Sequence, residues 1–215
     1  MDYRELAREV LRQATISGAS AAEVGIVESE SFSVLVRMRG VDTVKSALEK
    51  RLGLRLFLGR RSATTATSDF SPAALDRLVA DTLAMAEATP EDPFGGLPDS
   101  SAFAAELPDL DLWDAEASRL SIPDRIHLAG KAESAALSLD PRITNSEGSE
   151  YGHEDARVFF ANSHGFTGEY RASSVVLSAT PVAKDDAGMQ RDAWYSVQRR
   201  LCRLDPSAVE LLDRA

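Results

Sequence analysis

The sequence is poor in cysteine and has no long apolar run. Its single cysteine, Cys202 in 215 residues, cannot form an intramolecular disulfide, and this suits a reducing compartment. No stretch of about 18 apolar residues occurs, which excludes a membrane-spanning helix. The first residues also lack the basic-then-apolar order of a signal peptide. We therefore expect a cytoplasmic protein with no part in the membrane.

Positive charge is also scarce. Lys and Arg number 24 against 34 Asp and Glu, which gives a formal net charge of −10. An acidic chain is poorly suited to bind nucleic acid, because phosphate contacts need clustered Lys and Arg. One small basic cluster, at Arg199, Arg200 and Arg203, has acidic neighbours that favour a solvated surface over a phosphate site. We expect no nucleic-acid partner.

Histidine, the commonest metal ligand, occurs three times. His153 and Glu154 begin like the zinc-peptidase pattern, in which two His one helical turn apart bind the metal, but Arg157 stands where the second ligand belongs. His127 and His164 have no Cys or carboxylate at ligand spacing. The chain also lacks a Gly-x-Ser-x-Gly elbow and a Gly-rich phosphate loop. The sequence therefore predicts no catalytic residue, no metal site and no cofactor in this chain.

Hydrophobic periodicity in the first part of the chain predicts strands between two helices. Apolar residues three to four apart indicate helices over 2–17 and 71–88, the second with Ser71 as N-cap and Pro72 in its first turn. Alternating apolar and polar residues predict the strands between them. These strands cover 32–38, 43–50, 52–58 and 64–68. Because their connections are short, we expect antiparallel neighbours, and residues 1–88 are predicted to form an N-terminal α+β domain.

The second part of the chain repeats this order. Residues 89–120 are rich in proline and also contain aromatics and leucines, so we expect a connector packed on the surface. A helix is predicted over 121–139, and a polar loop over 184–190. The strands around that loop are predicted over 143–151, 156–162, 169–180 and 192–200. They complete a second α+β domain over 121–204, and residues 205–215 are predicted to start a truncated helix that leads to a missing β domain.

The predicted fold class is therefore α+β, with two consecutive units of helices packed on antiparallel β-sheets. Two segments in it carry more polar and aromatic side chains than a core needs. Residues 162–166 form a turn signal, read either as a plain hairpin or as a loop facing a cavity. Residues 188–196 include Trp194 and Tyr195. This segment is interpreted either as a strand end where Trp194 fills a core or as an inner rim that touches peptide or a partner subunit. The candidate cavity- or partner-contacting residues are Asn162, His164, Phe166, Met189, Gln190, Arg191, Asp192, Trp194 and Tyr195.

Several motifs together resemble the TldD/PmbA family, whose members were once described as modulators of DNA gyrase. They are Thr67-Ser68-Asp69-Phe70-Ser71-Pro72, Ala88-Thr89-Pro90-Glu91-Asp92-Pro93-Phe94, Asp140-Pro141-Arg142-Ile143 with Asn145-Ser146-Glu147-Gly148, Ala161-Asn162-Ser163-His164-Gly165-Phe166, and Gly188-Met189-Gln190-Arg191-Asp192. They follow one another in family order across nearly the whole chain. The last motif, with the Trp-Tyr-Ser after it, is more similar to the PmbA branch, also called TldE.

The resemblance implies a metallopeptidase-family subunit in three parts, of which this chain holds the first two. The third part is mostly β, and in the TldD branch it binds zinc through a His-Glu-x-x-x-His stretch that the PmbA branch lacks. The two kinds of subunit pair into a cytoplasmic peptidase that encloses unfolded peptides. Zinc is therefore expected only in the sister subunit or in the missing part. The expected partners are a TldD-like sister subunit, or a second copy in a dimer, and peptide substrates.

Two alternatives remain open. The chain could be the front of a zinc-bearing TldD-branch peptidase, and the sequence that follows residue 215 would decide this. It could also be a non-enzymatic interaction module of the gyrase-modulator type. In that case its acidic surface would suit a basic protein better than DNA. No catalytic residue is carried over in either case, because no position matches the metal motif.

Overall fold

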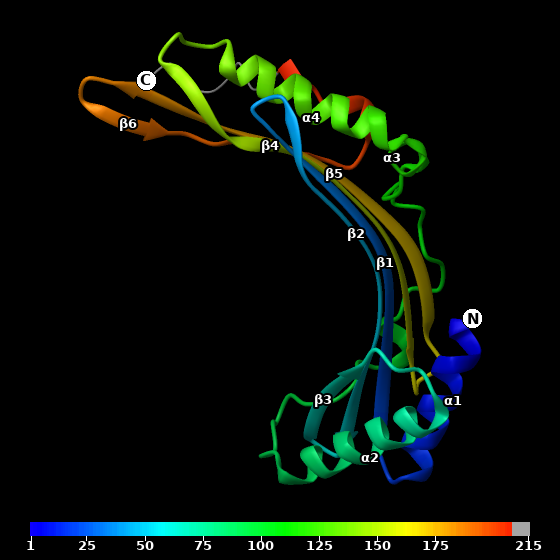
Figure 1. The fold of residues 1–215 in the computed structure, drawn as a ribbon. Coiled ribbons are helices and arrows are strands. Elements are labelled where there is room, and N and C mark those ends of the chain that lie inside the picture. The colour runs from blue at the N-terminus through cyan, green and yellow to red at the C-terminus, as the bar shows by residue number, and fades with distance from the viewer. Residues whose placement is uncertain (208–215) are drawn as a thin grey trace. The chain divides into compact units, whose positions relative to one another are not determined.

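The computed structural model describes residues 1–207, and Figure 1 shows the order of their elements. The helices are α1 (Tyr3–Ile16), α2 (Pro72–Ala88), α3 (Ala115–Arg119) and α4 (Ile122–Leu137), with short 3-10 turns at Ser100–Ala102 and Leu201–Arg203. The strands are β1 (Ala21–Arg37), β2 (Gly40–Leu58), β3 (Arg61–Thr67), β4 (Ile143–Asn162), β5 (Thr167–Asp185), β6 (Gly188–Arg191) and β7 (Trp194–Gln198). The predicted α+β class is confirmed. None of the described helices has the length and apolar composition to cross a membrane.

The strands form one sheet in the order β3-β2-β1-β4-β5-β6, and β7 also pairs with β5. The pairs β2–β3, β5–β6 and β5–β7 are antiparallel. Contacts divide the chain into two units that share the long strands. The first unit contains residues 1–29, 49–110 and 157–171, and the second contains 30–48, 111–156 and 172–215. These units interleave along the chain, while the consecutive domains over 1–88 and 121–204 stay a prediction.

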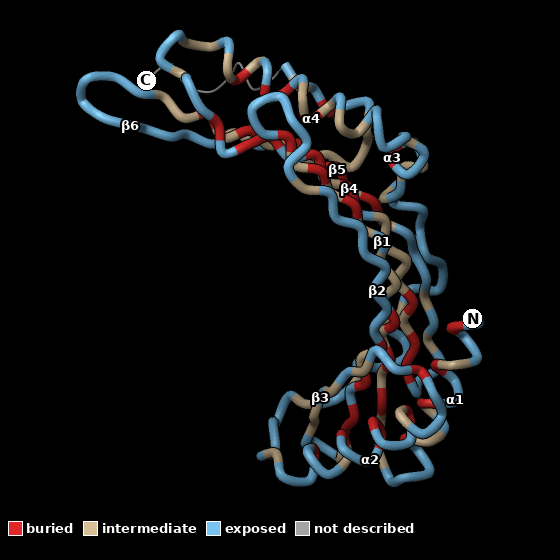
Figure 2. Tube along the Cα trace, in the orientation of Figure 1, coloured by how far each residue is buried: buried red, intermediate tan, exposed pale blue. Residues whose placement is uncertain are grey.

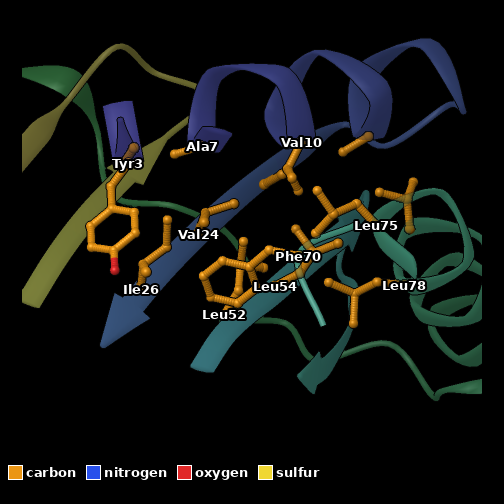
Figure 3. Close-up of a cluster of buried hydrophobic side chains, with 14 of the residues drawn as sticks. Tyr3, Ala7, Val10, Val24, Ile26, Leu52, Leu54, Phe70, Leu75 and Leu78 are labelled. Atoms are coloured by element: carbon orange, nitrogen blue, oxygen red, sulfur yellow. The ribbon is translucent and has the colours of Figure 1, made fainter. Parts of the chain in front are cut away.

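In the first unit, α1 and α2 share one apolar core with the strands. Asp2 caps α1, because its carboxylate accepts hydrogen bonds from the backbone N of Arg4 at 2.9 Å and of Glu5 at 3.3 Å. One stripe of α1 then faces β1 and β2, and α2 adds its leucines to the same cluster (Figure 3). The main side chains of this core are Tyr3, Ala7, Val10, Val24, Ile26, Leu52, Leu54, Leu56, Phe70, Leu75 and Leu78.

In the second unit, α3 and α4 cover one face of the strands. The core contains Phe32, Val34, Val36, Ala117, Ala129, Ala132, Tyr151, Val175, Leu177 and Leu204. Between β1 and β2 the chain turns through Met38 and Arg39, both with positive φ, as a two-residue hairpin turn requires. The buried carboxylate of Glu133 on α4 accepts hydrogen bonds from the backbone N of both turn residues, each at 2.7 Å. A helix side chain therefore fixes this turn.

The helix predictions for 2–17 and 121–139 are confirmed, but several details were wrong. Ser71 occupies the N-cap position of α2 without a side-chain bond to the helix, and Asp69 instead accepts from its backbone N. The predicted strands 43–50 and 52–58 are one strand, as are 143–151 and 156–162. The predicted loop 184–190 contains the end of β5 and the start of β6. The helix predicted over 205–215 falls mostly outside the described residues.

Candidate functional site

The histidine that resembles the start of a zinc motif is a core residue of β4. His153 is 6% exposed, and its Nε2 lies 3.5 Å from the hydroxyl oxygen of Ser118. Burial lowers the pKa of His153, and the nearby Arg125 lowers it further, so the neutral imidazole is favoured. Within residues 1–207 no group of three or more His, Cys, Asp or Glu side chains could hold a metal ion.

Three of the predicted contact residues lie in the β4–β5 hairpin of the first unit. The side-chain oxygen of Asn162 accepts hydrogen bonds from the backbone N of His164 and of Phe166, both at 3.1 Å, and so fixes the turn. The ring nitrogen Nδ1 of His164 lies 3.1 Å from the carbonyl oxygen of Pro98. Phe166 stacks on Phe103 with ring centroids 5.1 Å apart. These contacts hold part of the proline-rich segment against the hairpin.

The other six predicted residues lie in the second unit, on or beside β6 and β7. Met189, Gln190, Arg191 and Asp192 are exposed, and Arg191 forms an exposed ion pair with Glu147 at 2.8 Å. Trp194 packs on the core beneath α4, whereas Tyr195 is 74% exposed. Adjacent residues of a strand face opposite sides of the sheet. Tyr195 therefore lies on the sheet face that α3 and α4 leave open.

The nine predicted residues consequently form two groups, one in each unit, and not a single cluster. In the second unit, Tyr195 on β7 lies on the open face of the sheet together with three other side chains. In the antiparallel register, Tyr195 lies opposite Ser178 and Val197 lies opposite Val176, so these four side chains share that face. Val197 was missed in the sequence, although its alternation with Trp194 and Ser196 is the signal that could have found it.

The edge of β2 in the second unit was also missed. Strand β3 pairs with Leu52–Leu58 of β2 only, and no other described strand lies on that side. Residues 40–48 are therefore an unpaired edge, and nearly all of them are exposed (Figure 2). Val41, Val44 and Leu48 present apolar side chains there. The signal in the sequence was a strand-like run without a clear apolar face.

A cavity of about 470 Å³ lies in the first unit between α1 and the β4–β5 hairpin. Arg4, Arg8 and Arg12 of α1 line it, and Asn162 and Thr167 line it from the hairpin side. Nothing in the local sequence around these arginines connects them with the hairpin. That connection needs the tertiary structure, since the two segments are about 150 residues apart in sequence.

The fold, with helices packed on an antiparallel sheet in each unit, can be compared with known proteins. Residues 22–86 match the family profile described as PmbA/TldA metallopeptidase domain 1, and residues 115–215 match the central domain of the same family. The chain is 33% identical over 207 residues to the metalloprotease PmbA of Escherichia coli O157:H7. This alignment covers 93% of this chain and 46% of that protein. It therefore spans about half the length of the curated relatives that it matches.

Solved structures agree with this. A proposed modulator of DNA gyrase from Bacteroides thetaiotaomicron superposes with a TM-score of 0.87 at 26% identity, over 97% of this chain and 47% of that one. TldE from Thermococcus kodakarensis superposes with a TM-score of 0.79 over 96% of this chain and 46% of that one; at 14% identity this likeness shows the fold alone. The fold and both profiles define a metallopeptidase-family architecture. The chain belongs to the PmbA/TldD family.

Proposed function

We propose that this chain is the N-terminal region of a PmbA/TldE-like subunit in a cytoplasmic metallopeptidase complex, and that it is not catalytic itself. One observation carries the proposal: both family domains are matched, and within residues 1–207 no three or more His, Cys, Asp or Glu side chains gather as metal ligands. The zinc of such a complex would belong to a TldD-like sister subunit. The role of this chain would be to bind that subunit and to help enclose unfolded peptides.

The unpaired edge of β2 supports an association with another chain. A long edge strand with exposed apolar side chains is normally paired or protected, because it otherwise templates aggregation. Residues 40–48 contain no proline and no bulge-forming glycine beyond Gly40. Their backbone groups on the side away from β1 have no strand partner among the described elements. We assign this edge to the sister subunit, which would add a strand to the sheet.

The test is a pull-down of the tagged parent chain, meaning the full-length protein that contains these residues, from its own cells. The recovered proteins are identified by mass spectrometry. The expected result is a second family member with the His-Glu-x-x-x-His stretch in equal amount. Recovery of copies of the parent chain alone would contradict the silent-partner role and favour a self-contained active site in the rest of the protein. Recovery of gyrase without any sister subunit would favour the interaction-module alternative.

Two variants locate the contact in the same experiment. Leu48→Glu places a charge on the β2 edge at a side chain that is 71% exposed, and Ile16→Glu places one at an equally exposed side chain at the end of α1. Burying an uncompensated carboxylate in an interface costs several kcal/mol. We therefore expect Leu48→Glu to reduce recovery of the sister subunit about tenfold or more, and Ile16→Glu to leave it unchanged. Equal recovery with both variants would remove the edge from the interface.

A further inference from the structure

The cavity between α1 and the β4–β5 hairpin has an unusual charge for this protein. Although the chain has a net charge of −10, the residues lining this cavity include three arginines and no acidic side chain. The volume of about 470 Å³ lies within the range of small-ligand and peptide pockets. The cavity is thus a local concentration of positive charge on an acidic molecule, and it attracts anions.

The three arginines differ in what they already bind. Arg12 is paired with Glu9 through two contacts, at 2.6 and 2.8 Å. Arg4 donates to the hydroxyl oxygen of Thr167 at 3.3 Å, which leaves most of its five N–H groups free for another acceptor. Arg8 lies between them, and it has no ion-pair or hydrogen-bond partner among the described residues. A guanidinium of this kind binds a carboxylate or phosphate through two parallel hydrogen bonds.

Asn162 supplies an independent indication of a ligand. The residue is 4% exposed and lines the cavity. Its side-chain oxygen is used by the hairpin turn, but its amide nitrogen is buried without a hydrogen-bond partner among the described residues. A buried donor left in this state costs about 1–3 kcal/mol. An acceptor oxygen at this end of the cavity would satisfy the donor once the atoms that cover the amide nitrogen move aside.

The spacing of the arginines selects the shape of the anion. Residues four apart on a helix rise by about 6 Å, so Arg4, Arg8 and Arg12 form a row of positive charges at that interval. Alternate residues of an extended peptide are about 6.6 Å apart and point to the same side. The backbone N–H groups at the start of α1 are already capped by Asp2, so the helix end offers little to a single phosphate.

We infer that this cavity binds an extended acidic peptide segment whose Asp or Glu residues alternate with other residues. Arg8 is the principal contact, and Arg4 binds the carboxylate on one side of it. Arg12 offers the carboxylate on the other side the N–H groups that Glu9 does not use. The amide of Asn162 donates to the segment as it passes the hairpin. The inference stands on the cavity and its charges, and does not depend on the peptidase role. The cavity is then a recognition site for acidic stretches of a peptide.

The test measures binding of a fluorescent heptapeptide, Gly-Glu-Ser-Glu-Ser-Glu-Gly, to the full chain by anisotropy. The comparison peptides replace each Glu by Gln or place the three Glu residues side by side. We expect the alternating peptide to bind about tenfold or more tightly than the Gln peptide and severalfold more tightly than the contiguous one. Its affinity should also fall as salt is added, because the contacts are ionic.

Arg8→Gln is the decisive variant, and Arg77→Gln, at an exposed arginine of α2, is its matched control. We expect Arg8→Gln to reduce the affinity for the alternating peptide about tenfold, and Arg77→Gln to leave that affinity unchanged. Equal binding of the Glu and Gln peptides, or unchanged binding by Arg8→Gln, would overturn the inference. Displacement of the peptide by free succinate at an equal concentration would also overturn it, since the cavity would then be a site for small dicarboxylates.

Discussion

At the scale of single residues, Glu133 on α4 fixes a turn that lies about 95 residues away in sequence. It is 1% exposed, and its two oxygens accept from the backbone N of Met38 and of Arg39 at the β1–β2 turn. Glu133→Gln keeps the shape but presents an amide donor to one of those N–H groups. We expect a loss of about 1–3 kcal/mol in the free energy of unfolding, measured by urea denaturation. The control Glu87→Gln, exposed on α2, should change it by less than about 0.5 kcal/mol.

His153 makes stability depend on pH. Its pKa is lowered from the ordinary value of 6.5, first by burial and then by Arg125, while Asp155, Glu30 and Glu154 act in the opposite direction. The unfolded chain therefore binds a proton at a higher pH than the folded chain does. The contribution of neutral His153 to the free energy of unfolding is fully present above about pH 6.5. It is lost as the pH falls toward the lower pKa that His153 has in the folded chain.

The prediction is that His153→Gln flattens this dependence. The free energy of unfolding of the wild-type chain should decrease between pH 7.5 and pH 5 by more than that of the variant, with a slope of at most about 1.4 kcal/mol per pH unit. His127→Gln, at an exposed position of α4, is the control and should keep the wild-type profile. If His153→Gln and the wild type show parallel profiles, His153 is not the group responsible.

At the scale of elements, Gly148 determines how closely two neighbouring strands, β4 and β1, can lie. Its φ is +121°, and a Cβ there would lie 2.6 Å from Cδ1 of Leu35 and 3.1 Å from the carbonyl oxygen of Val36. The glycine thus lets β4 approach β1 closely. Gly148→Ala should destabilise the chain by about 1–3 kcal/mol, from the positive φ and the close contact together.

Gly130 is the opposite case and serves as the comparison. It lies within α4, has no positive φ, and a Cβ there would meet nothing within 4 Å. Gly130→Ala should therefore stabilise the chain by about 0.5–1 kcal/mol, because alanine loses less conformational freedom in a helix. Thermal unfolding of both variants checks the pair. A stable Gly148→Ala variant would show that β4 and β1 can separate without cost.

The helices and the strands differ in how well the sequence predicts their bounds. Helices α1 and α4 were predicted within two residues because their apolar stripes, their caps and their flanking Gly or Pro agree. Two strands were predicted as shorter pieces, with breaks at Arg51 and at residues 152–155, which lie inside β2 and β4. In the structure, neighbouring strands supply the hydrogen bonds that carry β2 and β4 through these positions. Such pairing is not local, and periodicity cannot reveal it.

At the scale of the whole molecule, the motifs identified the family but did not assemble a site. The hairpin residues Asn162, His164 and Phe166 lie in the first unit and the β6–β7 residues in the second. The arginine-lined cavity joins segments far apart in sequence and has no local pattern, so the tertiary fold was needed to find it. The free edge of β2 depends on where β3 stops pairing, which the strand-like run over 43–50 does not show by itself.

The central claim is that this chain contributes to a metallopeptidase without holding its metal. The most direct measurement is hydrolysis of an unfolded peptide by the purified full-length parent chain, by a TldD-branch subunit from the same cells, and by the two in equal amounts. The account predicts no cleavage by the parent chain alone, and cleavage by the mixture that a zinc chelator abolishes. Any cleavage by the full-length protein alone would contradict it, most directly if the chelator abolishes that cleavage.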